Sequence, residues 1–255
     1  MKKYAVITGA SSGIGAAFAK RLARQGYSLI LIARRKNRLE HLAKQLPTEC
    51  EILPADLTSL EECRRIYKMI SDKPIEIFIN NAGMGDCAPF IISDLDKELQ
   101  MIDLNVRAVH FFTKRMIQKM QKTDHGYLLN VASSAGLIPA GPYMAAYYAT
   151  KAYVTSLTRA AAMELQECGS HLYVGCLCPG PVDTEFNRVA NVEFSLNGIS
   201  ANFCTAYAFK QMKKRQTVII PKCYMRAAIF FGRFLTQDLY IRLVSRQQKK
   251  KIYHS

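Results

Sequence analysis

The chain of 255 residues has 49% apolar residues and a formal net charge of +15 at pH 7. This length suits one large α/β domain with a sizeable core. No apolar run approaches the ~18 residues of a membrane span, and residues 1–3 lead directly into a strand-like segment instead of a signal peptide. We therefore expect a cytoplasmic protein without a transmembrane helix.

Strand-like apolar runs alternate with amphipathic helical patterns from the first residues onward. Continuous apolar strands separated by such helices predict a parallel sheet that is covered on both faces. The βαβαβ order predicts a doubly wound, nucleotide-binding Rossmann fold in a single α/β domain. The six strand-like runs are residues 4–9, 27–34, 51–57, 75–83, 127–134 and 172–180.

The eight cysteines include no CxxC pair with the spacing of a metal or redox site, so we expect no metal. Cys176 and Cys178 are two apart in a predicted strand and therefore share one face. We interpret them as reduced core thiols, which agrees with a cytosolic compartment.

A glycine-rich turn, TGASSGIG, follows the first strand and opens a helix. Glycines permit a sharp turn and let backbone N–H groups approach a pyrophosphate, while the helix N-terminus favours an anion. An ordinary strand-to-helix turn is the alternative. We expect the turn to bind a dinucleotide through Gly9, Ser11, Ser12, Gly13, Ile14 and Gly15.

Two adjacent tyrosines, Tyr147 and Tyr148, precede Lys151 in a segment with helical character, AAYYATKAY. Both spacings to the lysine bring side chains together on a helix, so helix geometry leaves the choice between the tyrosines open. A nearby positive charge can stabilise a phenolate and make tyrosine an effective acid and base near neutrality.

The GxxxGxG spacing of the glycine turn resembles that of the short-chain dehydrogenase/reductase family. The resemblance continues in register over roughly the first 190 residues. The matching positions are Asp56 with Leu57, NNAG at residues 80–83, Asn105, Ser134, Tyr147 with Lys151, and PGPVDT at residues 179–184.

The resemblance implies a complete reductase site. Ser134 would bind the substrate carbonyl oxygen, Tyr147 would protonate it, and Lys151 would lower the tyrosine pKa and hold the nicotinamide ribose. Asn105 would anchor a water that links Lys151 to solvent. Ser133 is a local alternative, but the thirteen-residue spacing to Tyr147 favours Ser134, and Ser133 is expected on the other side of the strand end.

The resemblance also implies further contacts to a nicotinamide cofactor. The second strand is followed by arginines and no carboxylate before Glu40, which favours NADP(H) over NAD(H). Arg34 is the principal candidate for the 2′-phosphate and Arg35 the second, while a solvated basic turn is the alternative. The remaining expected contacts are Asp56, Leu57, Asn81, Ala82, Gly83, Tyr147, Lys151, Pro179, Gly180, Val182 and Thr184.

We divide the single domain into a core of residues 1–190, a substrate lid at 185–209 and a basic amphipathic extension at 210–255. The lid is rich in apolar residues, which favours a lipophilic substrate: Phe186, Val189, Val192, Phe194, Leu196, Ile199, Phe203 and Tyr207. The extension has twelve Lys and Arg against the single acid Asp238, and we expect its helix to break near Gly232 and restart at Thr236. It could lie on an anionic membrane surface or pack on the protein.

These features predict an NADPH-dependent carbonyl reductase/alcohol dehydrogenase that acts on a lipophilic ketone or aldehyde, such as a 3-oxoacyl, long-chain or steroid-like compound. The alternative is a non-catalytic NADP(H)-binding regulatory or membrane-associated scaffold. A homodimer or homotetramer is the assembly usual in the family. No nucleic-acid recognition motif accompanies the basic C-terminus, so we expect no nucleic-acid partner.

Overall fold

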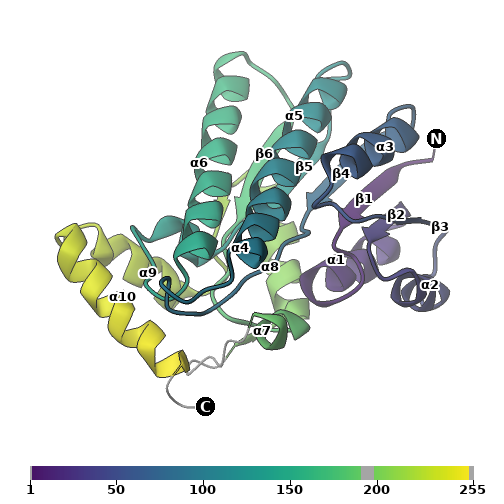
Figure 1. Cartoon of the computed structure of the whole chain (residues 1–255). Coiled ribbons are helices and arrows are strands. Elements are labelled where there is room, and N and C mark those ends of the chain that lie inside the picture. Colours follow the sequence, from purple (N-terminus) through teal and green to yellow (C-terminus); the bar gives the residue numbers. More distant parts are fainter. Residues whose placement is uncertain (1, 191–197, 253–255) are drawn as a thin grey trace.

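The computed structural model describes residues 2–190 and 198–252 and has a central sheet between helices (Figure 1). Within these residues the sheet contains seven strands, and every pairing is parallel. The strand order is β3-β2-β1-β4-β5-β6-β9, which confirms the doubly wound single domain. The strands are β1 (Tyr4–Thr8), β2 (Ser28–Ala33), β3 (Cys50–Pro54), β4 (Ile75–Asn80), β5 (Tyr127–Val131), β6 (Tyr173–Leu177) and β9 (Val218–Ile219).

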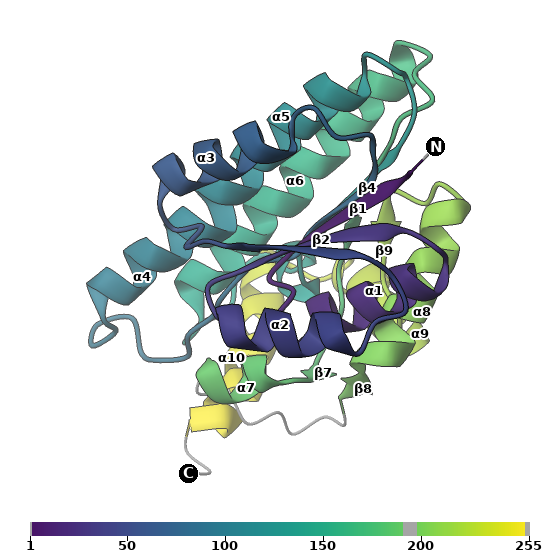
Figure 2. The same cartoon turned by 90° about the vertical axis from the view of Figure 1, so that its right-hand side faces the viewer.

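Helices cover both faces of this sheet, which is why its strands are continuously apolar (Figure 2). One face packs against α1 (Gly13–Arg24), α2 (Lys36–Lys44) and α8 (Ala201–Lys213). The other packs against α3 (Leu60–Ile70), α5 (Val109–Met120) and α6 (Ala145–Glu167). All six residues of β2 are buried, and Cys176 and Cys178 are buried free thiols whose sulfurs lie 3.8 Å apart, as expected.

The segment expected to form the substrate lid divides into two parts. Phe186 on α7 (Glu185–Val189) lines the main cavity, whereas α8 belongs to the helical layer of the core. Cys204, Ala208 and Met212 recur every four residues on α8, and this apolar stripe is buried. The side chains of Val189, Val192, Phe194 and Leu196 lie outside the described residues.

The basic C-terminal segment forms two helices at one end of the molecule, α9 (Cys223–Gly232) and α10 (Gln237–Ile252) (Figure 1). The Thr236 hydroxyl accepts a hydrogen bond from the Leu239 N–H at 3.4 Å, so the expected restart of the helix is confirmed. The break at Gly232 lets the chain turn closely past Tyr240, whose ring lies 2.4 Å from the position of a Cβ on that glycine. Among the described helices, none combines the length and the apolar character needed to cross a membrane.

Candidate active site

A cavity of about 580 Å³ lies at the carboxyl ends of the central strands. In a doubly wound fold this edge, where the strand order reverses between β1 and β4, is where ligands bind. Gly15 and Asn105 lie behind its wall, and every other residue predicted to bind cofactor or substrate lines it: Gly9, Ser11, Ser12, Gly13, Ile14, Arg34, Arg35, Asp56, Leu57, Asn81, Ala82, Gly83, Ser134, Tyr147, Lys151, Pro179, Gly180, Val182 and Thr184.

The glycine turn forms a cradle in which Gly9 and Gly15 cannot be replaced by a larger residue without a clash. Gly9 has a φ of +64°, and a Cβ on it would lie 2.8 Å from the Asn81 amide nitrogen. A Cβ on Gly15 would lie 2.3 Å from the Gly9 carbonyl oxygen. The Asn81 amide donates to the Thr8 and Gly9 carbonyls at 2.9 and 3.2 Å, which ties the turn to the end of β4. This compact turn at the start of α1 fits a pyrophosphate.

The side chain of Arg35 contacts the glycine turn. Its guanidinium donates to the hydroxyls of Ser11 and Ser12 at 3.1 and 3.0 Å and to Glu185 at 2.9 Å. Arg34, the first candidate from the sequence, instead lies 4.0 Å from Asp56. The structure therefore places the second candidate nearest the phosphate cradle, because the chain turns into α2 directly after Arg35.

Glu185, the first residue of α7, forms ion pairs with two arginines. Its carboxylate accepts hydrogen bonds from Arg38 at 2.6 Å and from Arg35 at 2.9 Å. These two guanidinium groups lower the pKa of Glu185 to about 2, so its negative charge is retained at neutral pH. The sequence analysis did not single out this carboxylate, since it lies 150 residues from Arg35 along the chain.

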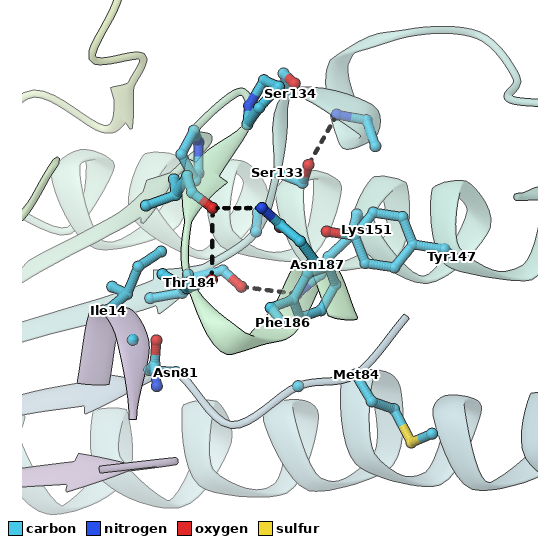
Figure 3. Close-up of a pocket in the computed structure, with 18 of the residues that line it drawn as sticks. Ile14, Asn81, Met84, Ser133, Ser134, Tyr147, Lys151, Thr184, Phe186 and Asn187 are labelled. Carbon is cyan, nitrogen blue, oxygen red and sulfur yellow. Dashed lines mark hydrogen bonds between the residues drawn. The ribbon is translucent and has the colours of Figure 1, made fainter. Parts of the chain in front are cut away.

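Tyr147 projects from the first turn of α6 into the cavity beside Phe186, with ring centroids 5.8 Å apart. Burial raises the pKa of Tyr147 to about 12, and hydrogen bonding with the Ser133 side chain opposes that rise. The hydroxyl of Ser133 lies on the side of Tyr147, and that of Ser134 is turned away (Figure 3). The serine beside the tyrosine is thus Ser133, and not Ser134 as the spacing predicted.

The backbone explains which serine faces the tyrosine. The 3-10 turn of residues 134–137 follows β5 at once, and Ser133 is its N-cap, with a hydroxyl that accepts from the Ala135 N–H at 3.1 Å. Ser134 begins that turn, and its N–H donates to the Pro179 carbonyl at 2.8 Å. Strand alternation therefore ends before Ser133, and it does not determine where this side chain points.

Lys151 lies one helical turn after Tyr147 and is 4% exposed. Its ammonium group is 5.7 Å from the centroid of the Tyr147 ring and donates to the Val131 carbonyl at 3.0 Å. Burial lowers the pKa of Lys151 to about 8. Close packing holds this helix in place, because a Cβ on Gly136 would lie 2.3 Å from the Lys151 carbonyl oxygen.

Tyr148, the other tyrosine, is turned away from this group. Its hydroxyl accepts a hydrogen bond from the Gln248 amide nitrogen of α10 at 2.6 Å. The two adjacent rings are nearly perpendicular, at 73°. The structure thus brings Tyr147, Lys151 and Ser133 together and gives Tyr148 a different neighbour, in agreement with the expected role of Tyr147.

Asn105 is fully buried in a short π-helical segment, Asp103–Ala108, between α4 (Leu95–Ile102) and α5. Its amide donates to the Met84 carbonyl at 2.8 Å and to the Thr150 hydroxyl at 3.1 Å, and its oxygen accepts from the Met84 N–H at 2.9 Å. Segments of this kind often occur at functional sites. Asn105 therefore ties the loop after β4 to the helix that carries Lys151.

The far wall of the cavity comes from the C-terminal helices, whose lining residues the sequence analysis did not identify. Tyr240, Val244 and Gln248 recur every four residues along α10, which is the signal that could have predicted a common face. Lining residues that the sequence analysis did not name include Met84, Ile138, Met144, Asn187, Tyr224, Met225, Ala228 and Ile229.

The family model described as short chain dehydrogenase matches residues 3–194 of this chain. The chain belongs to the short-chain dehydrogenase/reductase family. Members of this family are oxidoreductases that use a nicotinamide cofactor, and the glycine cradle and the strand-end cavity fit such a cofactor.

Three similar proteins illustrate this membership. An uncharacterized oxidoreductase of Staphylococcus epidermidis is 34% identical over 185 residues, which cover 72% of this chain and 79% of that protein. Very-long-chain 3-oxoacyl-CoA reductase-B of Danio rerio is 31% identical over 73% of this chain, and the match spans only 62% of that reductase. A solved short-chain dehydrogenase of Sphingobium yanoikuyae in complex with NADPH has a TM-score of 0.81 and 31% identity, with 93% of this chain and 94% of that chain covered.

Proposed function

We propose that this oxidoreductase is an NADPH-dependent carbonyl reductase that acts on lipophilic ketones or aldehydes. The observation that carries the proposal is the convergence of Ser133, Tyr147 and Lys151 at the junction of the cofactor cradle and an apolar pocket. A hydrogen-bond donor, a proton donor and a buried cation are the groups that carbonyl reduction requires. Alcohol oxidation is the reverse reaction of the same site.

The mechanism assigns one task to each side chain. The Ser133 hydroxyl donates a hydrogen bond to the substrate carbonyl oxygen, and the Tyr147 hydroxyl transfers its proton to that oxygen. The Lys151 ammonium favours this transfer, because its charge stabilises the phenolate that forms. The glycine turn, residues 81–83, Lys151 and the turn at residues 179–184 would hold NADPH, which would supply the hydride.

We assign the preference for NADPH over NADH mainly to Arg35 and expect a smaller contribution from Arg34. A charge-assisted hydrogen bond to a phosphate contributes about 1.5–3 kcal/mol, so Arg35→Ala is expected to raise the KM for NADPH about tenfold to a hundredfold. The KM for NADH should change little, because NADH has no 2′-phosphate. Steady-state kinetics with both cofactors check this, with Arg34→Ala as the matched variant. A larger loss for Arg34→Ala would return the role to Arg34.

The substrate class follows from the walls of the pocket. Met144 and Phe186 pack in one apolar cluster with Tyr147, and Ile229 on α9 lines the same cavity. The name of the Danio rerio relative, a very-long-chain 3-oxoacyl-CoA reductase, supports an acyl-type or other long apolar substrate. NADPH oxidation across ketones and 3-oxoacyl thioesters of increasing chain length tests this class, and rates that fall with chain length would contradict it.

The pH dependence of reduction should follow the charge of Lys151. Its pKa of about 8 means that it is protonated below that pH and loses its charge above it, while Tyr147, with a pKa of about 12, keeps its proton. We therefore expect kcat/KM for ketone reduction to fall as the pH rises through about 8. Lys151→Arg keeps a charge at every accessible pH, so its profile should lack this fall even if its rate is low. An unchanged profile in Lys151→Arg would assign the fall to another group.

We also propose a peripheral contact between the C-terminal helices and an anionic lipid surface. Exposed apolar side chains gather here, with Phe231 67% and Phe234 76% exposed. Arg226 on α9, Arg233 between the two helices, and Arg242 and Arg246 on α10 are exposed as well, so the charge is complementary to acidic head groups.

Sedimentation with phosphatidylserine vesicles tests this contact. The wild-type protein should bind these vesicles, bind neutral phosphatidylcholine vesicles weakly, and dissociate as salt increases. The double variant Phe231→Ser/Phe234→Ser should lose binding, whereas Ile91→Ser, a matched change at a 93% exposed residue before α4, should not. Equal binding by both variants would contradict the proposal.

The expected homodimer or homotetramer stays a prediction that analytical ultracentrifugation can check.

A further inference from the structure

One polar side chain in the wall of the substrate pocket has an unused hydrogen-bonding atom. Gln248 is 3% exposed and lines the cavity from α10. Its amide nitrogen donates to the Tyr148 hydroxyl at 2.6 Å, whereas its oxygen Oε1 is buried and has no hydrogen-bond partner among the residues that the structure describes. A buried, unpaired acceptor costs about 1–3 kcal/mol, so such an atom requires an explanation.

The surroundings of Gln248 are apolar, which makes the pair it forms with Tyr148 a distinct polar subsite. Val244 and Tyr240 lie one and two helical turns before it on the cavity-lining face of α10. Met144, Tyr148 and Val244 belong to one buried apolar cluster, against which Tyr147 and Phe186 also pack. The Gln248–Tyr148 pair is therefore a polar group in a wall that Met144, Val244 and Phe186 make largely apolar.

We infer that Gln248 recognises a hydrogen-bond donor on the substrate, so that the preferred substrate is an apolar ketone or aldehyde with a hydroxyl group distant from its carbonyl. The inference rests on the proposed reductase function and makes its substrate class more specific. A substrate hydroxyl donates to Oε1 and satisfies this buried acceptor. A site built to pair with a polar group rejects analogues that lack it, because binding such an analogue leaves the acceptor buried and unpaired.

Three series of methyl ketones test this inference, identical in chain length and ended by a methyl, a methoxy or a hydroxyl group. At the chain length that reaches Gln248, we expect kcat/KM for the hydroxyl-ended ketone to exceed that of the methyl-ended ketone about tenfold or more. The methoxy-ended ketone should fall below the hydroxyl-ended one, since an ether oxygen cannot donate to Oε1. Equal values for the hydroxyl and methoxy ends at every length would overturn the inference.

Two variants of α10 separate recognition from general damage to the helix. Gln248→Leu should abolish or reverse the preference for the hydroxyl end, because a hydroxyl then enters an apolar wall without a partner. Gln247→Leu makes the same chemical change at the adjacent, exposed residue, which also borders the cavity, and it should keep the preference if the buried amide of Gln248 is the group that recognises the hydroxyl. Retention of the preference in Gln248→Leu would assign it to another group, and the wild-type comparison decides even if this variant does not fold.

A binding measurement distinguishes failure of the subsite from failure of the reductase proposal. Calorimetric titration of the Tyr147→Phe protein with the same ketones reports affinity without turnover. If the hydroxyl-ended ketone binds more tightly but no series is reduced by the wild-type protein, the subsite stands and the reductase proposal fails. If all series are reduced and bind equally well, the reductase proposal stands and the subsite fails.

Discussion

Tyr147→Phe is expected to lower kcat for ketone reduction by about a hundredfold to ten-thousandfold, the usual contribution of a positioned general acid. The change removes only the hydroxyl oxygen and keeps the ring that packs against Phe186. Binding of NADPH should be nearly unchanged, so the loss should appear in kcat rather than in the KM for the cofactor. Steady-state kinetics, with fluorescence titration of NADPH, measure both quantities.

Two other tyrosines of α6 provide matched controls. Tyr153→Phe removes a hydroxyl that lies 2.7 Å from the His110 ring, away from the cavity, and should keep full activity. Tyr148→Phe should reduce kcat far less than Tyr147→Phe, because its hydroxyl bonds to Gln248. Full activity of Tyr147→Phe would instead favour a non-catalytic protein that binds NADP(H).

Ser133→Ala should lower kcat by about a hundredfold to a thousandfold, which is typical when one donor to a developing oxyanion is removed. Ser134→Ala, the change at the neighbouring residue, should have a much smaller effect, since its hydroxyl is turned away from Tyr147 (Figure 3). Ser133→Ala also removes the acceptor of the Ala135 N–H, which costs about 1 kcal/mol of stability. Rates should therefore be compared at a temperature where urea unfolding shows both variants to be folded.

Comparison of Ser133→Ala with Ser134→Ala shows whether the geometry of the structure or the thirteen-residue spacing identifies the catalytic serine. A larger loss in Ser134→Ala would show that the thirteen-residue spacing is the better guide to the catalytic serine. Equal and small losses would remove the serine from the mechanism and leave Tyr147 and Lys151 as the groups that act on the carbonyl oxygen.

Periodicity along the sequence was enough to predict the fold, and the resemblance to short-chain dehydrogenases/reductases predicted most of the residues that line the cavity. Continuous apolar strands require cover on both faces, and parallel strands bring their carboxyl ends to one edge, so Gly9, Asp56, Asn81 and Thr184 had to lie near one another. The restart of the helix at Thr236 was also predictable, because a capping hydroxyl acts within one turn of its own position. The spacing along α6 also predicted that Lys151 lies close to Tyr147, and its ammonium group is 5.7 Å from the centroid of that ring.

Tertiary structure decided which of two adjacent residues contacts the groups of the site. Ser133 and Ser134, and Arg34 and Arg35, line the same cavity, and packing against distant segments determines which member lies beside Tyr147 or against the glycine turn. Glu185 holds Arg35, and Gln248 holds Tyr148, across 150 and 100 residues. Likewise, α8 is part of the core because its apolar stripe packs against α1. Periodicity shows which residues share a face, but only the folded chain determines what that face meets.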